Sequence, residues 1–245
     1  MKRLFKKLFK GLIGVAIVTV SIAIITAGFL TYRAYHVTPL SDEEISSIGE
    51  NKAEKLMIVA HPDDETLWGG LHLLEGGYFV VCITNGNNST RKEEFYNVLK
   101  ESGNDGIILS YPDKVCTRRD NWKNIRSYIE SDIEKILKSK KWNMVVTHNP
   151  EGEYGHIHHK MTSSIVREKS IEYGMEKSLW YFGKYFRKAE VENIYEDMRE
   201  YDSEKLKGKE ELLSLYVSQE RTVNKLSHMN PYENWISYED WMSKN

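Results

Sequence analysis

The chain has 245 residues, of which 40% are hydrophobic, 29% charged and 11% aromatic. This length favours one domain with a short addition, and the composition excludes a collagen-like, low-complexity or largely disordered chain. Two cysteines, Cys82 and Cys116, are too few for a disulfide-built scaffold or a four-cysteine zinc module.

The charges are distributed unevenly along the chain. The formal net charge is −2, but the first 33 residues contain six basic residues and no acidic residue. The remainder of the chain therefore carries 28 basic residues against 36 acidic residues. A globular part this acidic does not favour the phosphate backbone of DNA or RNA, so we expect no nucleic-acid partner.

The first element is an apolar segment, residues 11–32, which contains no charged residue and follows a basic tail, residues 1–10. As a helix it is about 33 Å long, which suffices for a bilayer core of roughly 30 Å. A cleavable signal peptide is the alternative, but its apolar region is usually shorter and ends at a small-residue cleavage site. The sequence favours an uncleaved membrane anchor. The positive-inside rule then predicts a cytoplasmic N-terminus and an extracellular domain.

A polar linker is expected at residues 33–53, and one domain at residues 54–245. Within the domain, short apolar runs alternate with amphipathic stretches. Strands are expected at residues 56–60, 79–84, 107–109 and 144–147, and helices at residues 66–74, 91–100 and 125–137. This alternation indicates an α/β fold with a Rossmann-like, mostly parallel sheet flanked by helices and preceded by one transmembrane helix. Polar clusters that follow Ala60, Thr84 and Thr147 should meet at the carboxyl edge of that sheet.

The first of these clusters is His61-Pro62-Asp63-Asp64-Glu65. One imidazole and three carboxylates directly after a buried strand repel one another and lose hydration unless a cation is present, so a metal site is one interpretation. The alternative is that the acidic residues cap the helix that begins near Thr66.

The second cluster contains His156, His158 and His159, which follow the fourth predicted strand. If His156 and His159 open a helix, their i, i+3 spacing places both on one face. A solvated polar turn is the alternative. Two imidazoles and a carboxylate from the two clusters, with one coordination position open, would suit a hydrolytic Zn²⁺ ion, and iron(II) would also fit.

These motifs resemble those of the PIG-L/LmbE-like zinc-dependent de-N-acetylases. The resemblance rests on residues 60–65 with Gly69-Gly70 and Gly76, on residues 84–87 with Arg91 and Glu94, and on residues 155–159. A weaker match is Tyr216-Val217-Ser218-Gln219, which is similar to the end of a late helix in the family. The similarity covers roughly residues 55–220.

The resemblance implies a role for each matched residue. His61, Asp64 and His159 would be the zinc ligands, Asp63 the general base that acts on zinc-bound water, and His156 the residue that stabilises the oxyanion. Arg91, Tyr154 and His158 would lie on the substrate side, although a solvent-exposed Arg91 at a helix start is an alternative. Many members have Asp where this chain has His158, which affects how His156 is oriented.

The implied activity is removal of the N-acetyl group from an N-acetylhexosamine of the N-acetylglucosamine type. Together with the predicted orientation, the resemblance favours a bacterial cell-surface enzyme that acts on an envelope glycan or glycolipid. Two alternatives stay open: an anchored glycan-binding protein of the same fold without catalysis, and a metal-dependent hydrolase of another amide or an ester.

Overall fold

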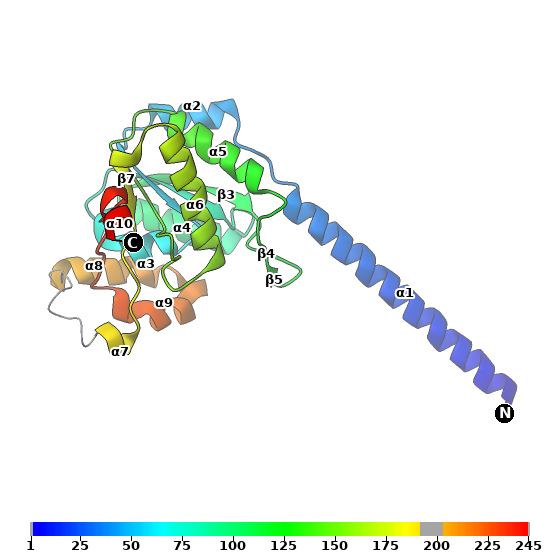
Figure 1. Ribbon diagram of the computed structural model, residues 1–245. Coiled ribbons are helices and arrows are strands. Elements are labelled where there is room, and N and C mark those ends of the chain that lie inside the picture. Colours follow the sequence, from blue (N-terminus) through cyan, green and yellow to red (C-terminus); the bar gives the residue numbers. More distant parts are fainter. Residues whose placement is uncertain (1, 192–202, 245) are drawn as a thin grey trace. The chain divides into compact units, whose positions relative to one another are not determined.

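The computed structural model describes residues 2–191 and 203–244, and the chain divides into two compact units (Figure 1). The first unit contains the residues up to Val37 and the insertion Pro112–Asp120. The second contains Thr38–Tyr111 and the residues from Asn121 onward. We describe each unit by itself.

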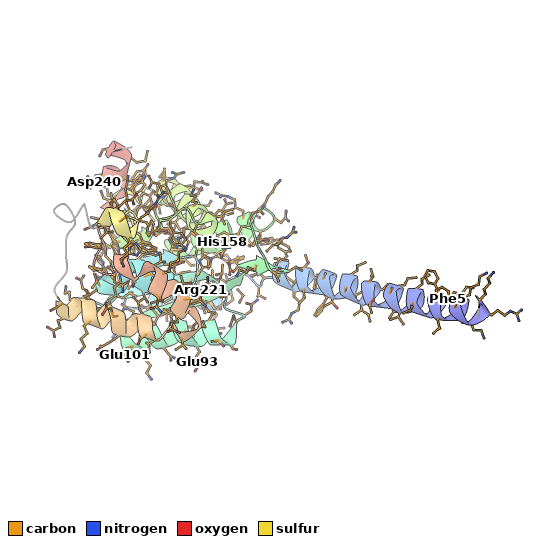
Figure 2. The ribbon with its side chains drawn as sticks, turned by 90° about the horizontal axis from the view of Figure 1, so that it is seen from below. Phe5, Glu93, Glu101, His158, Arg221 and Asp240 are labelled. Carbon is orange, nitrogen blue, oxygen red and sulfur yellow. The ribbon has the colours of Figure 1, made fainter. Side chains whose placement is uncertain are left out.

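The first unit consists of helix α1 (Lys2–Tyr35) and a hairpin of strands β4 (Lys114–Val115) and β5 (Arg118–Arg119). Residues Phe5–Tyr35 of α1 are long and apolar enough to cross a membrane, a property that signal sequences share. The large apolar side chains of α1, such as Phe5, are exposed (Figure 2). This exposure is what a helix surrounded by lipid requires, and a soluble core helix would instead be buried.

The second unit is built on a sheet with the strand order β3-β2-β1-β6-β7-β8 among the described residues. All neighbouring strands are parallel except β7 and β8, which pair antiparallel. The strands are β1 (Lys55–Val59), β2 (Tyr78–Thr84), β3 (Asp105–Tyr111), β6 (Met144–Thr147), β7 (Leu179–Tyr181) and β8 (Ile236–Ser237). Strands β1 and β2 are almost wholly apolar because helices cover both faces of the sheet.

The helices fall into two packed groups. Helix α5 contacts both α2 and α6, whereas α8 contacts both α3 and α4. Glu93 and Glu101 project outward from α4 (Figure 2), while its opposite face is buried. The helices are α2 (Asp42–Glu50), α3 (Asp64–Leu73), α4 (Ser89–Glu101), α5 (Arg126–Lys138), α6 (Ile157–Glu172), α7 (Lys188–Val191), α8 (Ser203–Ser214), α9 (Glu220–Leu226) and α10 (Tyr238–Lys244), with 3₁₀ turns η1 (Glu176–Ser178), η2 (Val217–Gln219) and η3 (Ser227–Met229).

The predicted fold class is confirmed, with one difference at the expected linker, residues 33–53. Part of this segment is helix α2, which begins with a capping box formed by Ser41 and Glu44. Ile48 is buried, and the backbone N–H of Leu40 donates to Asp132 of α5. The segment from Thr38 onward therefore packs as part of the domain, because capping and burial outweigh its high charge.

Both cysteines are free: Cys82 is buried in β2, and Cys116 is exposed in the hairpin. The C-terminal segment packs back on the domain. Strand β8 extends the sheet beyond β7, and the indole of Trp235 stacks on His72 with ring centroids 3.6 Å apart.

Candidate active site

The polar clusters meet where the chain reverses its direction across the sheet. The chain adds β2 and β3 on one side of β1 and then β6 and β7 on the other side, so the switch point lies between β1 and β6. The backbone N–H of Ala60, after β1, donates to Nε2 of His148, after β6, over 3.0 Å. The hydroxyl of Thr84, at the end of β2, donates to the carbonyl of Ala60 over 2.8 Å. The expected convergence is confirmed, and it occurs at the position where open α/β sheets bind ligands.

The acidic residues after β1 do not cap helix α3 in the way that the alternative interpretation required. Asp63 is the N-cap residue, but its side chain makes no capping hydrogen bond, and its φ of 118° is one that few L-residues adopt. Oδ2 of Asp64 instead accepts the backbone N–H of His61 over 2.8 Å. The turn therefore directs the carboxylates of Asp63 and Asp64 to the sheet edge at a conformational cost, which is common at functional sites.

Three predicted metal ligands lie together. His61, Asp64 and His159 each offer one donor atom within 4.8 Å of the others, and all three are buried. Nδ1 of His61 is 3.1 Å from Oδ2 of Asp64, and Nε2 of His159 is 3.2 Å from Oδ1. The contact from Nε2 of His159 lacks hydrogen-bond geometry, so this buried nitrogen has an ionic neighbour but no hydrogen-bond partner among the described residues. This donor set suits a divalent ion such as Zn²⁺, because two ring nitrogens and a carboxylate converge in a buried place. Nε2 of His159, which makes no hydrogen bond within the described part of the chain, is available to bind the ion.

Two other groups could also hold an ion. One consists of His61, His156 and His158, and the other of His148, Glu153 and His159. Each shares one residue with the first group, so the three describe one histidine-rich cluster. The set with Asp64 combines two imidazoles with one carboxylate, the combination that hydrolytic zinc sites use.

Sequence reasoning missed Glu153 and His148. Oε2 of Glu153 lies 2.5 Å from Nδ1 of His159 and 3.0 Å from Nδ1 of His148. Although burial acts to raise the pKa of Glu153, the two imidazoles lower it to about 2. A carboxylate behind a ligand histidine fixes which ring nitrogen faces the metal. An acidic residue six positions before His159 is the sequence signal that could have identified it.

Asp63 is next to Arg91, which differs from the exposed arginine of the alternative interpretation. The guanidinium of Arg91 is buried, lies 3.5 Å from Oδ2 of Asp63 and donates to the carbonyl of Pro62. Burial raises the pKa of Asp63 to about 7, against the opposing effect of Arg91. Such a carboxyl group can take up and release a proton near neutral pH.

His158 is fully buried, which differs from its predicted place on the substrate side. Its ring stacks on Trp122 with centroids 4.2 Å apart, and its Nδ1 lies 3.1 Å from Nε2 of His61. If Nδ1 of His61 faces a metal, Nε2 carries the ring proton and donates a hydrogen bond to Nδ1 of His158. The ring of His158 then orients His61 from behind, as the outer partner of a metal ligand does.

The remaining predicted residues lie around the same cluster. The ring of His156, the residue that precedes α6, lies edge-on to His61 with centroids 4.8 Å apart. Tyr154 is 41% exposed, and its ring lies 5.9 Å from that of His156 and 6.0 Å from that of Tyr185. An exposed aromatic ring beside a half-buried histidine is suitably placed to contact a bound molecule.

The segment Tyr216–Gln219 forms hydrogen bonds with Glu65 and Glu94, which belong to two of the earlier motifs. The hydroxyl of Tyr216 donates to Glu65 over 2.5 Å, and the hydroxyl and backbone N–H of Ser218 donate to the two oxygens of Glu94, each over 2.7 Å. The segment therefore fixes the acidic residues that support the Asp63 turn and α4.

Beyond its site end, helix α3 packs closely against strand β1 and against the C-terminal part of the chain. A Cβ atom at Gly69 would lie 2.8 Å from the methyl carbon of Met57, and one at Gly70 would lie 2.8 Å from Cγ of Lys209. The ammonium of the fully buried Lys209 donates to Glu233 over 2.6 Å and to the carbonyl of Leu67 over 2.8 Å. The two glycines of the motif thus allow α3 to pack against these side chains.

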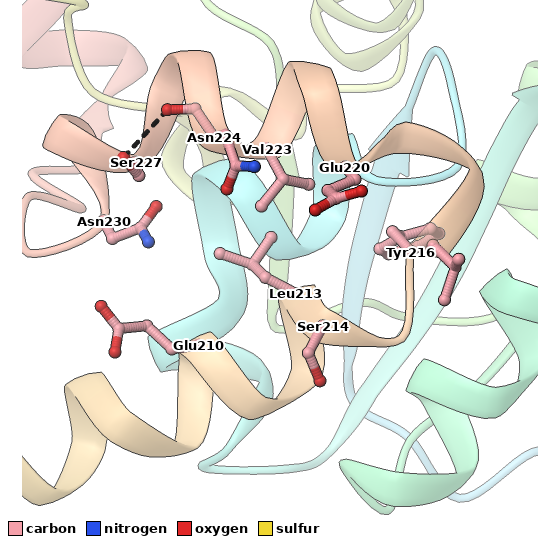
Figure 3. Close-up of a pocket in the computed structure, with 10 residues that line it drawn as sticks. Glu210, Leu213, Ser214, Tyr216, Glu220, Val223, Asn224, Ser227 and Asn230 are labelled. Carbon is pink, nitrogen blue, oxygen red and sulfur yellow. Dashed lines mark hydrogen bonds between the residues drawn. The ribbon is translucent and has the colours of Figure 1, made fainter.

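A pocket of about 520 Å³ lies between α8 and the segment from η2 to η3 (Figure 3). It contains none of the predicted site residues, and Tyr216 is the lining residue that also contacts the Asp63 turn through Glu65. The pocket is therefore separate from the histidine cluster.

The sequence also matches a known protein family. Residues 56–170 match the family model of PIG-L, GlcNAc-PI de-N-acetylase. The chain is therefore similar to the PIG-L family over these residues. The match includes β1 with the Asp63 turn, Arg91, and the histidines that begin α6, so the resemblance inferred from the motifs is confirmed.

The chain is also similar to a viral protein and to a deacetylase of known structure. An uncharacterized protein of Acanthamoeba polyphaga mimivirus is 36% identical in a 132-residue alignment that covers 47% of this chain, and the chain spans 57% of that protein's length. The crystal structure of a deacetylase–bog complex in the biosynthesis pathway of teicoplanin aligns with a TM-score of 0.55 at 15% identity. It covers 71% of this chain and 90% of the deacetylase, and it shows the shared fold.

Proposed function

We propose that this protein is a membrane-anchored, metal-dependent deacetylase that removes the N-acetyl group from an N-acetylhexosamine in a glycan or glycolipid. The observation that carries the proposal is the convergence of His61, Asp64 and His159 beside a buried Asp63 whose pKa is about 7. The PIG-L match and the deacetylase of similar fold support the reaction class.

A divalent ion held by His61, Asp64 and His159 would supply Lewis acidity, which polarises the amide carbonyl and makes water more acidic. The carboxylate of Asp63 accepts a proton from the attacking water as a bond forms between the water oxygen and the carbonyl carbon. The C–N bond then breaks, the nitrogen takes up a proton, and acetate and a free amine are released.

His156 and Arg91 support this sequence from opposite sides. His156 can donate a ring N–H to the developing oxyanion or to the departing nitrogen, since it is half-buried and adjoins His61. Arg91 favours the ionised form of Asp63 by its positive charge. His61 and His159 keep their orientation because His158 and Glu153 contact their outer nitrogens.

The membrane part of the proposal rests on α1. Its exposed apolar surface and the basic residues in its first turns support an anchor with a cytoplasmic N-terminus. Carbonate extraction of membranes from expressing cells tests it: an anchored chain stays in the pellet, and a cleaved or peripheral chain appears in the supernatant.

Acetate release tests the chemistry. The full-length protein in detergent should be assayed on N-acetylglucosamine conjugates with added Zn²⁺, after chelation, and as the Asp63→Asn variant. We expect loss of activity after chelation, and a reduction of roughly 10²- to 10⁴-fold in kcat for Asp63→Asn with the bound zinc unchanged. The exposed Glu101→Gln is the matched loss of a carboxylate and should retain full activity.

The outcome distinguishes the alternatives. Stoichiometric zinc without acetate release from any conjugate would favour a glycan-binding protein. Release from O-acetyl but not from N-acetyl sugars would favour an esterase, and a protein that binds no metal after reconstitution would contradict the site itself.

A further inference from the structure

The hairpin of the first unit lies along the last turn of α1. Sγ of Cys116 is 3.9 Å from Oγ1 of Thr31, and the hydroxyl of Tyr35 donates to Asp120. Thr31 and Tyr35 are four residues apart and so lie on one face of the helix. The tip of the hairpin is therefore next to Thr31, which belongs to the uncharged stretch of residues 11–32.

The tip has a defined shape. Cys116 and Thr117 connect β4 to β5, and their φ angles of 48° and 71° form a tight two-residue turn. Lys114 pairs with Arg119 in the ladder, and Val115 pairs with Arg118. Three of the six residues from 114 to 119 are therefore cationic, and they are held by the ladder within two residues of the tip.

Two of the three cations of the hairpin are not paired with an acidic side chain in the described part of the chain. Arg119 forms an ion pair with Asp113 over 2.8 Å, whereas Lys114 and Arg118 form no ion pair with any residue in the described part of the chain. Both are exposed. Arg33, one turn after Phe29, lies over the ring of that residue and adds a further cation to the same end of α1.

We propose that the basic hairpin, residues 114–119 with Arg33, binds the phosphate groups of anionic phospholipids at the C-terminal end of α1. This inference rests on the proposed membrane anchor. With residues 11–32 across the hydrocarbon core, Thr31 lies at the boundary between hydrocarbon and headgroups, and the hairpin tip that contacts it is at headgroup depth. Lipid phosphates are the anions at that depth, and each nearby Lys or Arg strengthens the attraction.

The two cysteines provide a way to test this with the full-length chain. Cys116 is exposed, whereas Cys82 is fully buried and burial raises the pKa of its thiol, so a thiol-reactive fluorophore should label Cys116 selectively. The labelled protein is placed in nanodiscs of equal phosphatidylglycerol and phosphatidylcholine. In two parallel samples, a headgroup-level nitroxide quencher is carried either by the anionic lipid or by the zwitterionic lipid.

We expect quenching to report about fivefold enrichment of phosphatidylglycerol around the hairpin for each unpaired cation that contributes. The Lys114→Gln/Arg118→Gln variant should lose the enrichment that these two cations supply and keep only the roughly fivefold enrichment expected from Arg33. Lys92→Gln/Lys100→Gln removes the same charge from the exposed face of α4 and should leave it unchanged. Raising the salt to about 0.5 M should weaken the enrichment of the wild type as well, by screening.

Equal quenching by the two lipids in the wild type would overturn the proposal, as would an enrichment that the Lys114→Gln/Arg118→Gln variant retains in full. Failure of the anchor itself is detected separately, because such a chain is released by carbonate and does not incorporate into nanodiscs.

Discussion

The two ends of helix α3 each adjoin a buried set of charged side chains, and the sets differ in how completely the protein satisfies them. At the C-terminal end, Lys209 donates to Glu233 and to a backbone carbonyl, and Glu233 accepts the backbone N–H of Leu71. At the N-terminal end, Nε2 of His159 and Nε of Arg91 are buried without a hydrogen-bond partner in the described structure. A satisfied buried pair is part of the packing, whereas an unsatisfied set indicates a place for a bound species.

Removal of one member of the satisfied pair should have the largest effect on stability. Lys209→Met would leave Glu233 charged and buried without its main counterion, which typically costs about 3–5 kcal/mol. We expect the free energy of unfolding, measured by urea titration in detergent with tryptophan fluorescence, to fall by about this amount.

Lys205→Met is the matched control on the same helix, because Lys205 pairs with Glu75 at the surface, where both side chains are more than 40% exposed. That variant should lose at most about 1 kcal/mol. Similar losses for the two variants would mean that the buried pair does not hold α3 in place.

A smaller effect is expected at the other end of α3, on metal affinity rather than on folding. Glu153→Gln replaces the carboxylate behind His159 by an amide, and loss of such an outer partner usually weakens metal binding by about 10- to 100-fold. Competition with a chromogenic chelator measures the zinc Kd. The exposed neighbour substitution Glu151→Gln should leave Kd unchanged, and an unchanged Kd in Glu153→Gln would assign the contact to packing alone.

The smallest predicted effect concerns pH. Burial raises the pKa of Asp63 to about 7, while Arg91 opposes this rise. Because the ionised carboxylate is the active form, kcat should fall as pH decreases through this pKa. Arg91→Gln removes the opposing charge and should move that limb upward by about one pH unit. A bound cation lowers the pKa of Asp63 in both proteins, so the quantity to measure is the difference between the pKa values of the wild type and Arg91→Gln. The same acidic limb of the kcat–pH profile in both proteins would exclude the effect of Arg91.

The sheet edge could be predicted from the sequence because each strand and the polar residues that follow it are neighbours along the chain. Each of β1, β2 and β6 is an apolar run that ends in polar residues, and parallel strands bring such ends together. The family motifs then suggested which of these residues act together, and the structure places the donor atoms of His61, Asp64 and His159 close to one another.

The supporting contacts could not be predicted in the same way. Glu153 reaches His148 and His159 because the loop has left-handed backbone at Gly152, Glu153 and Gly155, and the sequence there is also typical of a solvated turn. Lys209 and Glu233 are far apart in the sequence, and a lysine on an amphipathic helix is usually exposed. Such contacts depend on tertiary packing, which a single sequence does not display.

The backbone at Asp63 also limits how this position can evolve. A φ of 118° disfavours most side chains but is tolerated better by asparagine and glycine. Aspartate and asparagine codons differ by a single base, and asparagine preserves the shape of the turn while it cannot accept a proton. Under the proposed function, a folded variant that keeps the metal ligands but does not hydrolyse the substrate is therefore one nucleotide change away, and it would bind a glycan without any rebuilding of the fold.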